Sequence, residues 1–118
     1  ITEPIDVAKA EEAIKSDPDI AVVYCCHHET GTGVLNPIRE IGAVAHKYGK
    51  TMVVDTTSTY AMIPIDMDKD NLDFIMASAQ KGLMSMTGLS YVIGNTEMIE
   101  ASKDYPNQIL LYEPVHAV

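Results

Sequence analysis

Short apolar and β-branched runs recur along the chain, each bounded by turn-forming or charged residues. Continuous runs at 20–26, 52–55 and 72–77 are typical of strands that a parallel sheet buries on both faces. A fourth run, 89–93, follows a segment (78–88) without helical periodicity, so we expect it to return antiparallel without a crossover helix. The pattern predicts an α/β fold with a mostly parallel sheet and one antiparallel strand.

Helical spacing of apolar positions appears before, between and after these runs. Asp6 is the expected N-cap of the first helix. Asn36 is the expected N-cap of the second, with Pro37 at its first position. Asn95 or Thr96 is expected to cap the third. Helices are therefore predicted over 6–16, 37–48 and 96–103, and the first strand, second helix and second strand form a βαβ unit.

The remaining segments read as connections. A glycine-containing loop is expected over 27–36, and an irregular, exposed loop over 56–70, where Asp and Lys alternate after Pro64. Residues 107–118 continue no readable pattern and form an unassigned tail. The other residues, 1–106, are expected to form part of one domain.

Composition excludes several classes of function. The net charge is −9, and the eight Lys and Arg residues are dispersed, which argues against a nucleic-acid partner. No apolar run approaches the roughly 20 residues of a membrane helix, and no signal-peptide pattern opens the chain. We therefore expect a cytosolic protein without a membrane partner. The first residue is Ile1 rather than Met, so a processed protein or a piece of a longer one is expected.

Cysteine and histidine cluster after the first apolar run. Cys25 and Cys26 are adjacent strand residues that point to opposite faces, so we expect buried apolar side chains rather than a disulfide or a joint metal site. His27, His28 and Glu29 follow directly. Consecutive residues at a strand end lack the spacing of a chelate, so a structural or site-lining role is expected and no metal is predicted.

A carboxylate and an amine follow two of the predicted strands. Asp55 ends the 52–55 run, and Lys81 lies in a loop of small and flexible residues after the 72–77 run. Open α/β sheets bind ligands at the carboxyl ends of their strands, so both groups are expected to face one crevice. A cationic ring nitrogen and an aldehyde, as in pyridoxal phosphate, match this pair. On pattern alone, a surface lysine and a turn-capping aspartate remain the alternatives.

Four motifs, HHETGTGVLNPI, VVDTTS, SAQKGL and TGLSYVIG, occur in this order. Together they resemble the class V aminotransferases of pyridoxal-phosphate fold type I, over about residues 5–105. The resemblance implies that 1–106 belongs to the cofactor-binding large domain of a homodimeric enzyme. It also implies transfer of an amino group from a small-molecule donor to a 2-oxo acid.

Within the family, the motifs are most similar to members that use 2-aminoethylphosphonate and pyruvate, an activity of phosphonate metabolism. Alanine:glyoxylate or serine:pyruvate transamination is the first alternative, and a non-catalytic α/β binding domain is the second. Gly31 stands where these members have a hydroxyl residue, and SAQK replaces their SANK. These departures leave the substrate more open than the cofactor.

The resemblance also implies residue roles. Lys81 matches the lysine that bonds the cofactor covalently and carries protons, and flanking apolar residues are expected to desolvate it. Asp55 matches the partner of the pyridine nitrogen, and Thr57 lies near the ring. Thr30 matches the hydroxyl that bonds the phenolic oxygen, and Gln80 matches a phosphate contact. The family's phosphate loop, stacking aromatic and substrate-binding arginine are missing, so the isolated 118-residue chain is expected to be inactive.

Overall fold

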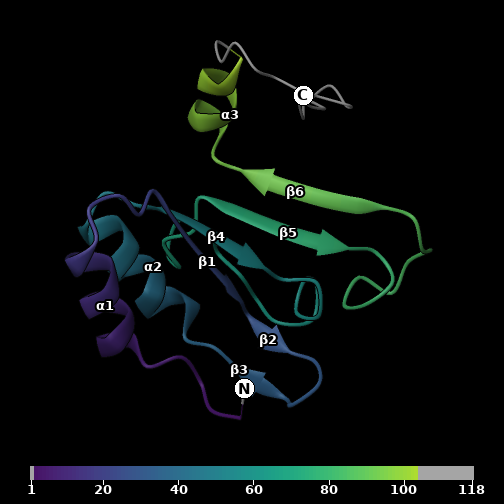
Figure 1. Cartoon of the computed structure of the whole chain (residues 1–118). Coiled ribbons are helices and arrows are strands. Elements are labelled where there is room, and N and C mark those ends of the chain that lie inside the picture. Colours follow the sequence, from purple (N-terminus) through teal and green to yellow (C-terminus); the bar gives the residue numbers. More distant parts are fainter. Residues whose placement is uncertain (1, 104–118) are drawn as a thin grey trace.

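The computed structural model describes residues 2–103 and has a mixed four-stranded sheet at its centre (Figure 1). The sheet order is β1-β4-β5-β6, with β1, β4 and β5 parallel and β6 antiparallel to β5. The predicted fold class is confirmed, including the antiparallel return. The elements in chain order are α1 (Val7–Ser16), β1 (Val22–Cys26), β2 (His28–Glu29), β3 (Val34–Leu35), α2 (Ile38–Lys47), β4 (Thr51–Asp55), β5 (Phe74–Ser78), β6 (Ser90–Gly94) and α3 (Thr96–Ser102).

Two predicted helix caps are confirmed. Asp6 Oδ1 accepts hydrogen bonds from Ala8 N at 3.0 Å and Lys9 N at 3.2 Å, which satisfies two amides of the first turn of α1. Asn95 Oδ1 accepts from Met98 N at 3.2 Å and caps α3 in the same way. Within the described residues, no helix has the length and apolarity needed to cross a bilayer.

The predicted Asn36 cap is wrong. The residue that precedes α2 is Pro37, and no side chain caps this helix. Asn36 is buried instead, with its Oδ1 accepting from Ile5 N at 2.9 Å and its Nδ2 donating to Cys26 O at 2.8 Å. Its amide therefore ties the N-terminal segment to the end of β1, a use that local sequence does not indicate.

Strand boundaries differ from the prediction by up to two residues. β1 begins at Val22 rather than 20, and β5 begins at Phe74 rather than 72. The 27–36 segment was expected to be a loop, but it contains the short antiparallel hairpin β2–β3. Glu29 O accepts from Thr32 N and Gly33 N, and the positive φ of Gly33 (76°) closes this turn. The hairpin strands are too short to give a period-two signal.

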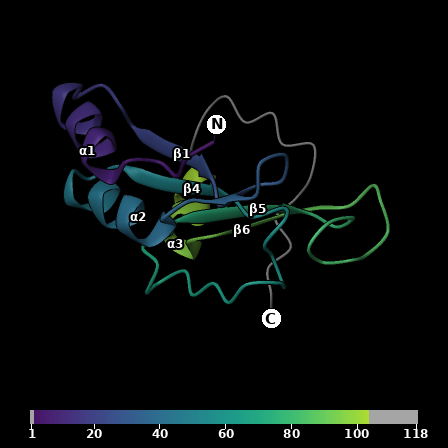
Figure 2. The ribbon, with the colours of Figure 1, turned by 90° about the horizontal axis from the view of Figure 1, so that it is seen from below.

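The core lies between α2 and one face of the sheet. The predicted apolar stripe of α2 buries Ile38, Ile41 and Ala45 against Met52 and Val54 of β4. α1 packs on α2, so both helices lie on the same side of the sheet, as Figure 2 shows. This arrangement fixes β4, and with it the position at which the strand ends.

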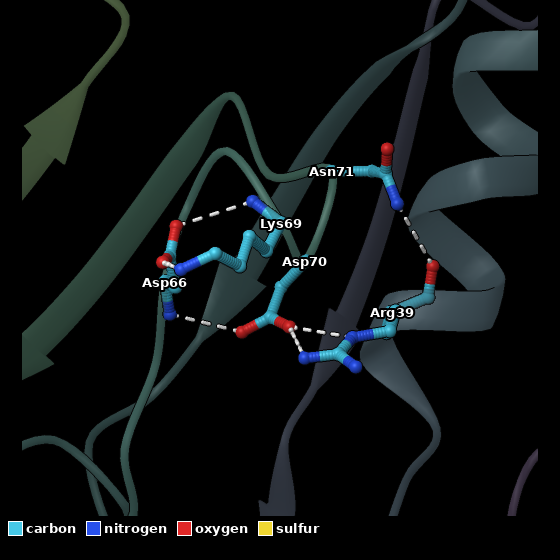
Figure 3. A network of polar contacts seen from close by, with 5 residues as sticks. All are labelled: Arg39, Asp66, Lys69, Asp70 and Asn71. Carbon is cyan, nitrogen blue, oxygen red and sulfur yellow. Dashed lines mark hydrogen bonds and ion pairs between the residues drawn. The ribbon is translucent and has the colours of Figure 1, made fainter.

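A polar network attaches the 66–71 segment to α2 (Figure 3). Arg39 donates to Asp70 Oδ1 through Nε at 2.8 Å and Nη2 at 2.7 Å, and Asp66 N donates to Asp70 Oδ2 at 3.0 Å. Asp70 is only 7% exposed, so the predicted exposed loop is wrong at this position. A Cβ on Gly42 would lie 2.5 Å from Asn71 O, so the helix needs glycine here. The connection to β5 is therefore held closely against α2.

The opposite face of the sheet has no helix over it within residues 2–103. Val22, Tyr24 and Val92 are 53%, 57% and 67% exposed on this side. The apolar run 20–26 predicted a strand buried on both faces, but the described part of the chain covers only one face. Open apolar surface therefore lies on the face of the sheet opposite α2.

Candidate active site

Asp55 is the last residue of β4, and its half-buried side chain lies on the open face. The strand register places it between Cys26 of β1 and Met76 of β5. Its Oδ1 accepts a hydrogen bond from Thr57 N at 2.8 Å. This bond orients the carboxylate. The carboxylate also interacts with Tyr24 of β1, whose pKa is raised first by burial and further by the charge and hydrogen bonding of Asp55.

Lys81 lies in a tight loop after β5, at the same edge of the sheet. Ser85 N donates to Ala79 O at 2.8 Å and Met84 N to Lys81 O at 2.8 Å, with Met84 at a positive φ of 52°. The amine is exposed, and Met84 is 81% exposed. The expectation that flanking apolar residues desolvate Lys81 is wrong for this chain, because the loop turns Met84 outward.

The hairpin β2–β3 brings Thr30 to the lysine. Lys81 Nζ donates to Thr30 Oγ1 at 3.2 Å, a contact between residues 51 positions apart. Thr57 lies beside Asp55 but touches its carboxylate through the backbone amide. Gln80 is exposed. Four of the five residues expected at the site therefore make contacts in two pairs, Lys81 with Thr30 and Asp55 with Thr57.

The charges of Asp55 and Lys81 both act on the Cys26 thiol. Burial raises its pKa most, and the carboxylates of Asp55 and Glu29 raise it further. The Lys81 ammonium acts on the same thiol in the opposite direction. Because all these charges affect one sulfur atom, the site combines both signs of charge at the carboxyl edge of the sheet.

A turn at residues 56–60 (the 56–60 turn) connects the Asp55 and Lys81 loops. Tyr60 N donates to Thr56 O at 2.7 Å, and Gly82 N donates to Thr57 O at 3.1 Å. A Cβ on Gly82 would lie 2.5 Å from Tyr60 O, so only glycine allows this approach. Residues 56–60 were predicted only as part of an irregular exposed loop, without this role. The hydroxyl run TTST directly after VVD was the available signal.

His27 and His28 also lie at this edge of the sheet. Within residues 2–103, no three His, Cys, Asp or Glu side chains converge as metal ligands. His27 Nδ1 lies 2.9 Å from Thr59 Oγ1, and His28 Nδ1 lies 3.1 Å from Ser58 Oγ. Both rings therefore bond the 56–60 turn.

A shallow apolar cleft of about 550 Å³ opens beside the Lys81 loop. Neither Asp55 nor Lys81 lines it, so its position does not define the candidate site. The lining residues are Tyr60, Ala61, Met62, Ile63, Pro64, Ile65, Ile75 and Leu83.

The available donor set matches the chemistry of pyridoxal phosphate. Asp55 offers a half-buried carboxylate to a cationic ring nitrogen, and Lys81 offers an amine to an aldehyde. Thr30 adds a hydroxyl 3.2 Å from that amine, where a phenolic oxygen needs a donor. No atom would lie within 4 Å of a Cβ added at Gly31, so the tip of the β2–β3 hairpin next to Thr30 is open.

Solved structures with this fold are pyridoxal-phosphate enzymes of fold type I. Pyridoxamine-pyruvate aminotransferase from Mesorhizobium loti is 28% identical and superposes with a TM-score of 0.80 over 89% of this chain and 27% of that one. Alanine-glyoxylate aminotransferase from Nostoc sp. gives a TM-score of 0.81 at 24% identity, over 93% of this chain and 29% of its own. The fold class is thus that of the fold-type-I large domain.

The chain belongs to the class V aminotransferase family, whose model matches residues 2–106. The family is pyridoxal-phosphate dependent. Among curated relatives, the 2-aminoethylphosphonate–pyruvate transaminases of Salmonella heidelberg (strain SL476) and Salmonella typhimurium (strain LT2) are each 37% identical over 106 residues. These residues are 90% of this chain and 29% of either relative, so the chain spans less than a third of their length.

Proposed function

We propose that the full-length protein is a pyridoxal-phosphate-dependent aminotransferase in which Lys81 is the covalent attachment residue and Asp55 the partner of the ring nitrogen. The observation that carries the proposal is the placement of both groups at the carboxyl edge of the parallel strands. The Lys81–Thr30 contact supports it, because it directs the amine toward the loop that follows β1.

The bound cofactor would supply an electron sink for the carbon that loses its proton during amino transfer. Asp55, held through Thr57 N at 2.8 Å, would keep the ring nitrogen protonated. Lys81 would carry the proton to and from the substrate carbon after substrate displaces its covalent bond. Thr30 would donate its hydroxyl proton to the phenolic oxygen, and Thr57 and Gln80 would complete the contacts to the ring and the phosphate.

We further propose 2-aminoethylphosphonate as donor and pyruvate as acceptor, in a homodimer. The 37% identity to transaminases named for these substrates supports this choice. The open space at Gly31 favours testing larger donors as well. Equal turnover with alanine or serine and glyoxylate would replace the proposed substrates without changing the residue roles.

The decisive experiment is attachment of pyridoxal phosphate to the full-length apoprotein, fixed by borohydride and located by peptide mass. The expected adduct lies on Lys81, and Lys81→Ala should lack both the adduct and amino transfer to pyruvate while melting like the wild type. Lys69→Ala is the matched control, because Lys69 is an exposed lysine in the connection between β4 and β5. Absence of an adduct in the wild type would favour a non-catalytic domain. Retention of a tenth of wild-type turnover in Lys81→Ala would contradict the role of Lys81 as the attachment residue.

A further inference from the structure

His27 is a buried histidine whose ring is hydrogen-bonded to a buried threonine. His27 is only 6% exposed and Thr59 only 2% exposed. His27 Nδ1 lies 2.9 Å from Thr59 Oγ1. Thr59 Oγ1 also bonds Thr56 O at 3.4 Å, an acceptor that takes the only hydroxyl proton. With that proton directed to Thr56 O, we assign the 2.9 Å contact as His27 Nδ1–H donating to the Thr59 oxygen. Burial lowers the pKa of His27, which favours the neutral ring.

His28 repeats the arrangement at the neighbouring residue of the turn. Ser58 Oγ donates to His28 O at 3.0 Å, so its lone pair faces the His28 ring nitrogen at 3.1 Å. His28 Nδ1 must then carry a proton and donate to Ser58. Two consecutive histidines thus bind two consecutive hydroxyls, Ser58 and Thr59.

The 56–60 turn that receives these bonds contacts both candidate catalytic loops. On one side, the turn directly follows Asp55, and Thr57 N donates to Asp55 Oδ1 at 2.8 Å. On the other side, Gly82 N donates to Thr57 O at 3.1 Å, and Gly82 is packed against Tyr60 O. A shift of the turn would therefore move the Lys81 loop relative to Asp55. Because reacting groups need sub-ångström placement, such a shift has a large effect on rate.

We propose that His27 and Thr59 are positioning residues, whose buried hydrogen bond fixes the 56–60 turn and so sets the placement of Lys81 relative to Asp55. The His28–Ser58 bond supports the same turn from its half-buried side. This role rests on the proposed function, since it concerns the attachment of cofactor to Lys81. In this role His27 and His28 act through hydrogen bonds to the 56–60 turn and bind no metal ion.

Thr59→Val tests the role because it replaces the hydroxyl with a methyl group of similar size. The measurement is the rate at which pyridoxal phosphate becomes attached to Lys81 in full-length apoprotein, quenched with borohydride and quantified by peptide mass. We expect Thr59→Val to slow attachment about tenfold and Thr59→Ser, which keeps the hydroxyl, to stay within about twofold of wild type. Equal rates for wild type and Thr59→Val would overturn the proposal.

Ile41→Val is the control for a general loss of stability. Ile41 is 1% exposed in the core between α2 and the sheet, and the substitution removes one buried methyl group without changing a hydrogen bond of the 56–60 turn. It should lower the apoprotein melting temperature while leaving the attachment rate unchanged. An equal slowing in Ile41→Val would show that the rate follows stability, which overturns a positioning role.

Coupling between the partners completes the test. If the His27–Thr59 bond carries the effect, the double variant His27→Asn/Thr59→Val should attach the cofactor no more slowly than Thr59→Val alone. The single variant His27→Asn should keep most of the attachment rate, because its amide offers a donor near the Nδ1 position. Additive slowing would overturn the pairing. Absence of any adduct in the wild type is a different result, because it rejects the proposed function as well.

Discussion

The two faces of the sheet are built by different interactions. On the helix-covered face, Met52 and Val54 have no exposed surface and pack against α2. On the opposite face, Tyr24 and Val92 are more than half exposed, and Asp55 lies at the strand ends. Apolar burial holds the first face, whereas hydrogen bonds between loops hold the groups at the edge of the second.

This difference separates the expected effects of substitution. Buried apolar area contributes about 25 cal/mol per Å² to folding, so changes beneath α2 act mainly on stability. Individual hydrogen bonds at the strand ends contribute only about 0.5–1.5 kcal/mol each to folding, yet they determine where reactive groups lie. We expect stability to depend on the covered face and chemistry on the carboxyl edge.

After the loss of activity expected for Lys81→Ala, the next largest effect is also on chemistry, in Asp55→Asn. The amide oxygen can still accept from Thr57 N, so the fold should be retained, but the negative charge for the ring nitrogen is lost. We expect the amino-transfer half-reaction to slow by about a hundredfold or more, equivalent to about 2.7 kcal/mol, with holoenzyme still forming. Rapid-mixing measurement of the half-reaction checks this, and an unchanged rate would count against the assigned role.

Asp73→Asn is the matched control for that variant. Asp73 lies at the opposite ends of the same strands, where its Oδ2 accepts from Met52 N at 2.7 Å and His46 Nε2 at 2.9 Å. Loss of this charge should weaken charge-assisted bonds and cost about 1 kcal/mol of unfolding free energy, with the half-reaction retained.

Gly42→Ala should cause a large loss of stability for a change of a single carbon. Its added Cβ would lie 2.5 Å from Asn71 O and 2.7 Å from Asp70 O, so α2 or the polar network must shift. We expect a loss of about 2 kcal/mol despite the better helix propensity of alanine. Urea unfolding measures the effect. Gly31→Ala adds the same carbon where nothing lies within 4 Å and should be nearly neutral, so equal losses would refute the steric explanation.

The smallest effect is a difference in reactivity between two adjacent thiols. Burial raises the pKa of Cys25 to about 11, whereas Cys26 is only partly buried on the opposite face. Because the thiolate is the reactive form, iodoacetamide near pH 8 should alkylate Cys26 about tenfold faster than Cys25. Peptide mass against time gives both rates. Similar rates in native protein would mean that the two faces are equally protected in the full-length protein.

Local sequence was sufficient to locate the three helices and the four strands of the central sheet to within two residues, but not the hairpin β2–β3. Apolar runs located β1, β4, β5 and β6, because side chains of a buried strand are apolar on both faces. Asp6 and Asn95 were recognised as caps because their partners lie two or three residues away. Asp55 and Lys81 were proposed from local sequence as well, since Asp55 ends one apolar run, Lys81 lies in the loop after another, and both match family motifs.

Only the tertiary structure determined how these groups are joined. Asn36 bonds Ile5, His27 bonds Thr59 and Arg39 bonds Asp70, with 31, 32 and 31 positions between the partners. Such pairs arise when parallel strands and their crossover helix bring distant loops to one edge, and no local periodicity records them. The sequence by itself therefore determined which residues lie at the strand ends, while strand pairing decided which of them bond and which face stays open.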